Sequence, residues 1–190
     1  MKAKISKTGY WEGDKAHIHH AHSKELAEYI TTILRGAEND PIYDLGCGQG
    51  YYLKHLEDNG FKYLLGFEGE VPAKKFFINI IQQDLAQDLD IPVKGHVICL
   101  EVLEHIPQEY EKKVVNNIKD AIGLDCLLIL SWAVEGQEGY GHVNCRNNDY
   151  VIDLFERKGF KYLPYLSNKA RESVGDDTPW FRNTLMIFKK

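Results

Sequence analysis

The sequence predicts an α/β fold in which a mostly parallel sheet is covered by helices on both faces. From residue 41 onward, short apolar runs typical of buried strands alternate with segments of helical periodicity. A glycine-rich turn at residues 46–50 follows the first of these strands. Strands that alternate with helices indicate a parallel sheet, because each crossover helix must pack on one of its faces.

Chain length, net charge, apolar stretches and cysteine content limit the possible classes of protein before any motif is considered. At 190 residues the chain fits one domain, which we expect to comprise a lid and helix at residues 1–36 and a Rossmann-like core at residues 41–190. The formal charge of -5 disfavours a surface built for nucleic-acid backbone. The longest apolar stretch, near residues 126–133, is too short for a membrane span, and the four unpaired cysteines indicate a cytoplasmic protein.

The N-terminal region is expected to be irregular over its first 22 residues and then helical. Ser23 is a plausible N-cap, and apolar residues recur at helical spacing as far as about residue 34. Gly36 then ends this helix.

The core elements follow from the same reasoning. Apolar or alternating runs predict strands at residues 42–45, 63–68, 78–85, 95–101, 126–132 and 183–188. Helical periodicity closed by a glycine predicts helices at residues 51–59, 109–122 and 149–158.

The glycine-rich turn carries the strongest functional signal. Glycines let the backbone turn tightly and approach a ligand, and the helix that follows presents free N–H groups. The dinucleotide fingerprint spaces its glycines G-x-G-x-x-G, whereas here the spacing is G-x-G-x-G and Asp44 precedes the first glycine by two positions. That carboxylate would repel a pyrophosphate and attract an ammonium, which favours S-adenosylmethionine (SAM) over NAD.

Further acidic residues are expected where later strands end. Glu68 ends the second strand about 20 residues past the glycines, where a carboxylate can accept both ribose hydroxyls. Asp84 ends the third predicted strand and is placed to accept from an adenine amine. Glu101 ends the fourth. Open α/β sheets bind their ligands at this rim.

On these motifs the chain resembles a class I SAM-dependent methyltransferase over residues 41–131. The resemblance implies a seven-stranded sheet of order 3-2-1-4-5-7-6 with the seventh strand antiparallel. It implies that Glu68 holds the ribose, that Glu101 lies along the floor of the cofactor, and that the adenine lies by Asp84 and Leu85. It places the methionine part of SAM among Asp44, Gly46, Gly48 and Gly50. The segment 69–77 is shorter than the helix usual in that family.

The flanks resemble a narrower group of small methyltransferases that have a tryptophan in an N-terminal segment and a Gly-His-Val-Asn loop, here residues 141–144. We predict that Trp11 and His20 close over the methionine end of SAM. His142 is the preferred general base, because an imidazole pKa near 6.5 suits proton removal at neutral pH. The alternative is that His142 only fixes its loop.

Two groups of residues are of types that can bind a metal ion, and we predict that neither does. Glu101, Glu104, His105 and His142 resemble the Glu-x-x-Glu-His plus later His that binds a divalent ion in some RNA-end and quinone-precursor O-methyltransferases. The same motif is widespread in methyltransferases that use no metal, so we predict none. A second set of possible ligands is His17, His19, His20 and His22.

The predicted activity is methyl transfer from SAM to a hydroxyl of a small molecule or glycan. The alternatives are a nucleic-acid or protein methyltransferase, a non-catalytic module that binds SAM or S-adenosylhomocysteine (SAH), and, least favoured, a nicotinamide dehydrogenase. Residues 100–103 read Leu-Glu-Val-Leu where base-amino methyltransferases usually carry Asn/Asp-Pro-Pro-Tyr/Phe, which argues against that class. We expect the acceptor site to include Trp132, Arg146, Trp180 and Phe181. The alternative is that these residues only take part in ordinary core and edge packing. The acceptor and the oligomeric state stay open.

Overall fold

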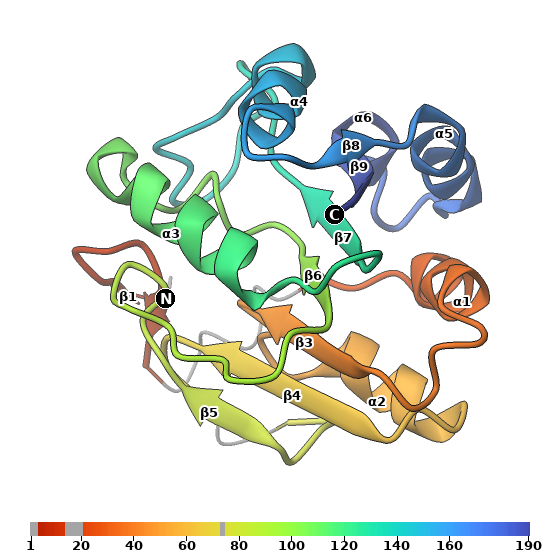
Figure 1. The fold of residues 1–190 in the computed structure, drawn as a ribbon. Coiled ribbons are helices and arrows are strands. Elements are labelled where there is room, and N and C mark those ends of the chain that lie inside the picture. The colour runs from red at the N-terminus through yellow and green to blue at the C-terminus, as the bar shows by residue number, and fades with distance from the viewer. Residues whose placement is uncertain (1–3, 14–20, 73–74) are drawn as a thin grey trace.

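A seven-stranded sheet forms the centre of the molecule (Figure 1). The computed structural model describes residues 4–13, 21–72 and 75–190. The strands of this sheet are β3 (Pro41–Leu45), β4 (Tyr63–Glu68), β5 (Ile80–Gln82), β6 (His96–Cys99), β7 (Leu127–Ser131), β8 (Lys161–Tyr162) and β9 (Leu185–Lys189). Their spatial order is β5-β4-β3-β6-β7-β9-β8.

The strand directions agree with the prediction. Strands β5, β4, β3, β6 and β7 pair in parallel, and β9 runs antiparallel to both β7 and β8. When the seven strands of this sheet are numbered in chain order from β3, their spatial order is 3-2-1-4-5-7-6 and the seventh strand, β9, is antiparallel. The predicted fold class is confirmed.

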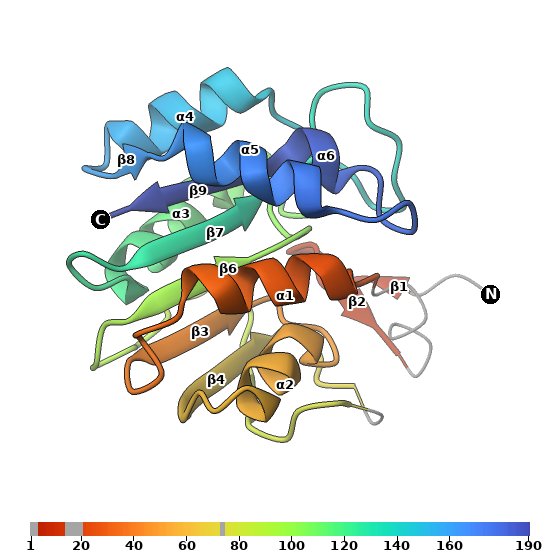
Figure 2. The same cartoon turned by 90° about the vertical axis from the view of Figure 1, so that its right-hand side faces the viewer.

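Helices cover both faces of the sheet, as Figures 1 and 2 show. They are α1 (Lys24–Ile33), α2 (Tyr51–Asp58), α3 (Gln108–Ala121), α4 (Asn148–Glu156), α5 (Pro164–Ser173) and α6 (Phe181–Thr184). Helices α3 and α4 contribute to one apolar core, and α1, α2, α5 and α6 contribute to the other. The sheet therefore has two buried faces, which explains why its strands are apolar on both sides.

Helix α1 forms as its sequence predicts. The Ser23 Oγ accepts a hydrogen bond of 3.2 Å from the Leu26 N–H and so caps the helix. Leu26, Ala27 and Ile30 are buried against the sheet. Full burial of an aliphatic side chain of this size stabilises the folded state by about 1.5–3 kcal/mol.

Several element boundaries differ from the prediction. The third strand is only Ile80–Gln82, so Asp84 lies in the turn beyond its end. Asn183 and Thr184 belong to α6, and β9 starts at Leu185, two residues later than predicted. The short strand β8 and helix α5 were not predicted, because two strand residues and a mostly polar helix give no strong periodic signal.

The N-terminal region also departs from the expected irregular segment. β1 (Lys4–Ile5) pairs antiparallel with β2 (Trp11–Glu12) to form a hairpin. The hairpin lies beyond the carboxyl ends of the parallel strands in Figure 2. No helix in the described part of the chain is long and apolar enough to cross a membrane.

Candidate functional site

A cavity of about 420 Å³ opens at the carboxyl ends of β3, β4 and β6. Its lining includes the glycine-rich turn after β3 and the loop that carries His142. The N-terminal hairpin lines it with residues 8–11. The cavity thus lies at the rim where the sequence placed its ligand.

The glycine-rich turn requires glycine for steric reasons. Gly46 adopts φ 79°, and a Cβ there would lie 2.4 Å from a methyl carbon of Val102. Gly50 adopts φ 76° immediately before α2, and a Cβ there would lie 2.6 Å from that of Phe77. A larger residue at either position would displace the turn that forms the wall of the cavity.

Asp44 is a buried acid in the cavity wall. It is 2% exposed, and its Oδ2 has no hydrogen-bond partner among the described residues. Burial, and to a smaller extent the charge of Glu68, raise the pKa of Asp44 to about 8. An uncompensated carboxylate of this kind is stabilised by a ligand that brings a positive charge.

Glu68 is held in place by the backbone at the end of β4. The Gly48 N–H donates to one carboxylate oxygen at 2.7 Å, and the Gly69 N–H donates to the other at 2.8 Å. Burial raises the pKa of Glu68, while these N–H groups act in the opposite direction. Each oxygen keeps a lone pair, so the carboxylate remains able to accept from two hydroxyls of a ligand.

Asp84 and Leu85 line the cavity from the turn after β5. One oxygen of Asp84 accepts from the Ala86 N–H at 2.9 Å. The other accepts from the Thr8 hydroxyl, also at 2.9 Å. Sequence reasoning missed Thr8, because nothing near it in the chain indicates a partner so far away.

Glu101 lines the cavity and adopts φ 57°. The Ser131 hydroxyl donates to its carboxylate at 2.8 Å and accepts from its backbone N–H at 2.7 Å. Burial raises the pKa of Glu101 to about 7. Ser131, the last residue of β7, is a positioning contact that the sequence did not reveal.

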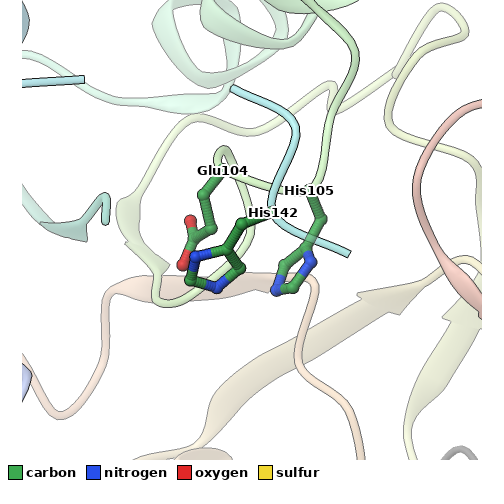
Figure 3. Close-up of side chains that lie close together, drawn as sticks. All are labelled: Glu104, His105 and His142. Atoms are coloured by element: carbon green, nitrogen blue, oxygen red, sulfur yellow. The ribbon is translucent and has the colours of Figure 1, made fainter. Parts of the chain in front are cut away.

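The far end of the cavity carries a cluster of polar rings and acids. The rings of Trp11 and His105 lie 5.2 Å apart, and those of His105 and His142 lie 5.0 Å apart, both edge to face. Figure 3 shows Glu104, His105 and His142 pointing toward one another. Burial, and then the charge of Glu101, raise the pKa of Glu104 well above its ordinary value.

The loop that bears His142 is fixed by contacts to α3 and to the turn before it. The backbone N–H groups of Val143 and Asn144 both donate to the Glu104 carbonyl at 2.9 Å. The side chain of Asn144 donates to Glu111 at 3.0 Å, and Arg146 forms an ion pair with the same carboxylate at 3.0 Å. This network determines where the imidazole sits.

The structure places most of the predicted site residues around the cavity. They are Trp11, Asp44, Gly46, Gly48, Glu68, Asp84, Leu85, Glu101 and His142. Gly50 shapes the turn without lining the cavity, and His20 lies outside the described residues.

The predicted acceptor residues are only partly placed at the cavity. Trp180 and Phe181 line it. Trp132 does not, because it is fully buried and its indole N–H donates to the Asn144 carbonyl at 2.6 Å. Arg146 is also absent from the lining, because Glu111 holds its guanidinium. For Trp132 and Arg146 the structure therefore supports the alternative, ordinary packing.

Comparison with known proteins supports the fold. No protein-family model and no curated protein sequence matches the chain. Among solved structures, it is similar to the magnesium protoporphyrin IX methyltransferase of Synechocystis PCC 6803 with SAH bound, at 18% identity and a TM-score of 0.60, covering 86% of this chain and 81% of that chain.

Two further structures have the same fold. The sugar N-methyltransferase KedS8 of Streptoalloteichus sp ATCC 53650 is 14% identical with a TM-score of 0.62, over 88% of this chain and 87% of that chain. The small RNA methyltransferase HEN1 is 15% identical with a TM-score of 0.65, over 88% of this chain and 25% of that chain. The chain therefore has the Rossmann-like fold found in these methyltransferases, whose names specify magnesium protoporphyrin IX, a sugar and a small RNA.

Proposed function

We propose that the cavity binds SAM and that the protein transfers its methyl group to a hydroxyl of a small molecule or glycan. The observation that carries the proposal is the pair of buried carboxylates at the ends of β3 and β4. Asp44 has a carboxylate oxygen with no hydrogen-bond partner in the part of the chain that the structure describes, which suits the ammonium of the methionine part. Glu68 is oriented by two backbone N–H groups and has lone pairs left for the two ribose hydroxyls.

The rest of the cofactor follows from this placement. Asp84, Leu85 and Glu101 all line the cavity, and we assign the first two to the adenine and Glu101 to the methionine part. Trp11 of the N-terminal hairpin also lines the cavity, and we assign it to covering the methionine end of SAM. Several of the structures with this fold are methyltransferases solved with SAM or SAH, which supports the same choice of cofactor here.

Methyl transfer is a single displacement. The acceptor oxygen forms a bond to the methyl carbon, the carbon–sulfur bond breaks, and its electron pair stays on sulfur to give SAH. Catalysis consists mainly of alignment, together with removal of the hydroxyl proton. We propose His142 as the catalytic residue, because it lines the acceptor end of the cavity next to Gly139 and Tyr140.

A neutral His142 has a defined tautomer in this arrangement. Its Nδ1 lies 3.1 Å from the Gln137 carbonyl, which can only accept, so the proton resides on Nδ1. The lone pair is then on Nε2, which is the nitrogen available for the acceptor hydroxyl.

A nucleic-acid acceptor is less well supported. The net charge of -5 offers little attraction for a phosphate backbone. A protein methyltransferase and a non-catalytic SAM- or SAH-binding module share the same cofactor residues, and only turnover separates them from the proposal.

The first experiment is calorimetric titration of the purified protein with SAM, SAH and NAD in parallel. Saturable binding of the two adenosyl ligands without NAD binding is the expected result. A screen of candidate acceptors with methyl-labelled SAM then tests turnover. NAD binding with no response to SAM would contradict the proposal, and SAM binding without labelling of any acceptor would favour the binding module.

A further inference from the structure

The loop after β7 folds back on the side chain of His142. The backbone N–H of His142 donates to the Gly139 carbonyl at 3.3 Å, and the ring nitrogen Nδ1 lies 3.1 Å from the Gln137 carbonyl. Gln137, Gly139 and His142 all line the cavity. Residues 137–142 therefore form a turn at the acceptor end, which we call the base turn, with the imidazole against its own backbone.

The imidazole lies directly against Gly139. A Cβ at position 139 would lie within 2.5 Å of three ring atoms of His142, namely Nε2, Cε1 and Cδ2. Real Cβ atoms essentially never come so close to other atoms, so a side chain at this position would push the ring aside. Gly139 does not adopt a positive φ, so this requirement for glycine comes from the contact and not from backbone strain.

The contact is with the face of the ring and not with its edge. An atom in the plane of the ring and so near to both carbons would be at bonding distance from Nε2. A Cβ at position 139 would therefore lie above the ring, and the backbone of Gly139 packs on that face. The lone pair of Nε2 lies in the plane of the ring, so Gly139 leaves it uncovered.

Gly139 and Gln137 restrict different motions of the imidazole. The carbonyl of Gln137 can only accept, so it fixes one edge of the ring at Nδ1. A single hydrogen bond still lets the ring swing about that point. The backbone of Gly139 blocks this motion on one face, and the ring of His105 packs against the imidazole at 5.0 Å with an interplanar angle of 77°. Together these contacts define the plane in which the Nε2 lone pair points.

We propose that Gly139 is a positioning residue for methyl transfer, because its bare backbone sets the plane of the His142 imidazole and so aims Nε2 at the acceptor hydroxyl. The inference rests on the proposed function, in which His142 removes the hydroxyl proton. That proton moves to Nε2 while the oxygen forms its bond to the methyl carbon, and the carbon–sulfur electron pair stays on sulfur. The other ring proton stays on Nδ1, donated to Gln137.

The first test reads the tautomer of His142 and needs neither SAM nor an acceptor. Long-range ¹H–¹⁵N NMR of the labelled full chain shows which ring nitrogen carries the proton, and His142→Ala identifies the signal. Spectra are taken at about pH 8.5, well above the ordinary imidazole pKa near 6.5. We expect a proton on Nδ1 in the unchanged protein. We expect Gly139→Ala to lose this preference, because the displaced ring leaves the Gln137 carbonyl.

Val143→Ala is the matched control for this measurement. Val143 lies in the same loop, its side chain is exposed, and its backbone N–H to the Glu104 carbonyl is kept in the variant. The control should retain the proton on Nδ1. A Gly139→Ala protein that retains it as well would overturn the proposal, and so would an unchanged protein without this tautomer.

Urea unfolding of a double-mutant cycle separates contact with the ring from a general effect on the base turn. Gly139→Ala should lower the unfolding midpoint of the unchanged protein relative to its effect in the His142→Ala background, where there is no ring to displace. An equal effect in both backgrounds would mean that the alanine does not act through the imidazole, which would overturn the proposal.

Labelled methyl transfer measures the kinetic consequence. Gly139→Ala should lower kcat by up to about 10²-fold and leave the KM for SAM unchanged, because only the alignment of the base is lost. Full kcat with a lost tautomer would overturn the positioning role.

SAH titration of every variant checks folding and keeps the two proposals apart. SAH binding together with a tautomer that Gly139→Ala does not change would overturn the positioning role alone. Absence of SAH binding by the unchanged protein would contradict the proposed function, whatever the tautomer.

Discussion

The two ends of the cavity are built in different ways. The cofactor end is formed by backbone at strand ends, where the Gly48 and Gly69 N–H groups orient Glu68. The acceptor end is formed by side chains from separate elements, and Glu111 of α3 holds its loop through Asn144 and Arg146. The first end can be recognised from contiguous motifs, whereas the second depends on long-range contacts. We therefore expect variants at the two ends to affect different measurable quantities.

The largest expected effect is at the acceptor end. His142→Ala should lower turnover by about 10²- to 10⁴-fold, because proton removal from the hydroxyl is lost. SAM affinity should be unchanged, since the cofactor carboxylates lie at the other end. Labelled methyl transfer and SAM calorimetry measure the two quantities, with His55→Ala as the matched control. Undiminished turnover would reduce His142 to a structural residue.

At the cofactor end the expected effect is on binding. Glu68→Ala should weaken SAM binding by roughly 1–3 kcal/mol, because the ribose hydroxyls lose their acceptors. Glu57→Ala is the matched control, since this acid is exposed on α2 and does not line the cavity. If SAM affinity is the same in both variants, Glu68 does not contact the cofactor.

Glu111 holds the loop that bears His142, so a change at Glu111 should affect both the stability of the protein and its turnover. The side chains of Glu111 and Arg146 are 11% and 20% exposed, and they form an ion pair. Glu111→Gln weakens this pair and should lower the free energy of unfolding by about 1–2 kcal/mol. Turnover should fall while SAM affinity holds. Urea unfolding measures the first effect, and Glu109→Gln on the exposed side of α3 is the control. A Glu111→Gln protein with full stability and turnover would show that the contacts of Glu111 do not hold the His142 loop in place.

The smallest expected effect concerns pH. Since burial raises the pKa of Asp44 to about 8, the ligand-free protein keeps this acid protonated at neutral pH. Pairing with the SAM ammonium requires the carboxylate, so SAM affinity should rise by up to about tenfold per pH unit and level off above pH 8. The ligand-free protein should become less stable over the same rise, because its Asp44 is protonated at a pH where the unfolded chain is ionised.

Calorimetry between pH 6 and pH 9 measures this dependence. Asp44→Asn should bind SAM more weakly and lose the part of the pH dependence that comes from this acid. An identical pH profile in the two proteins would mean that Asp44 does not exchange a proton on binding.

The sequence predicted the cofactor end far better than the acceptor end, for a physical reason. Asp44, Glu68 and Glu101 lie in or next to strands whose apolar pattern places them at the rim of the sheet. Trp132 and Arg146 follow the last parallel strand, in a loop whose path depends on contacts with α3. No local pattern encodes those contacts, so the sequence left open whether both residues line the acceptor site or pack elsewhere.

The contact between Thr8 and Asp84 has a consequence for folding. The two residues are 76 positions apart, so the N-terminal hairpin can dock only after the sheet that carries its partners has formed. An element that adds late through few contacts is also the first to detach, at a lower free energy than global unfolding. Native-state hydrogen exchange should therefore show residues 4–12 opening while the central strands stay protected. Such opening would give ligands a way in and out of the cavity without disturbing the core.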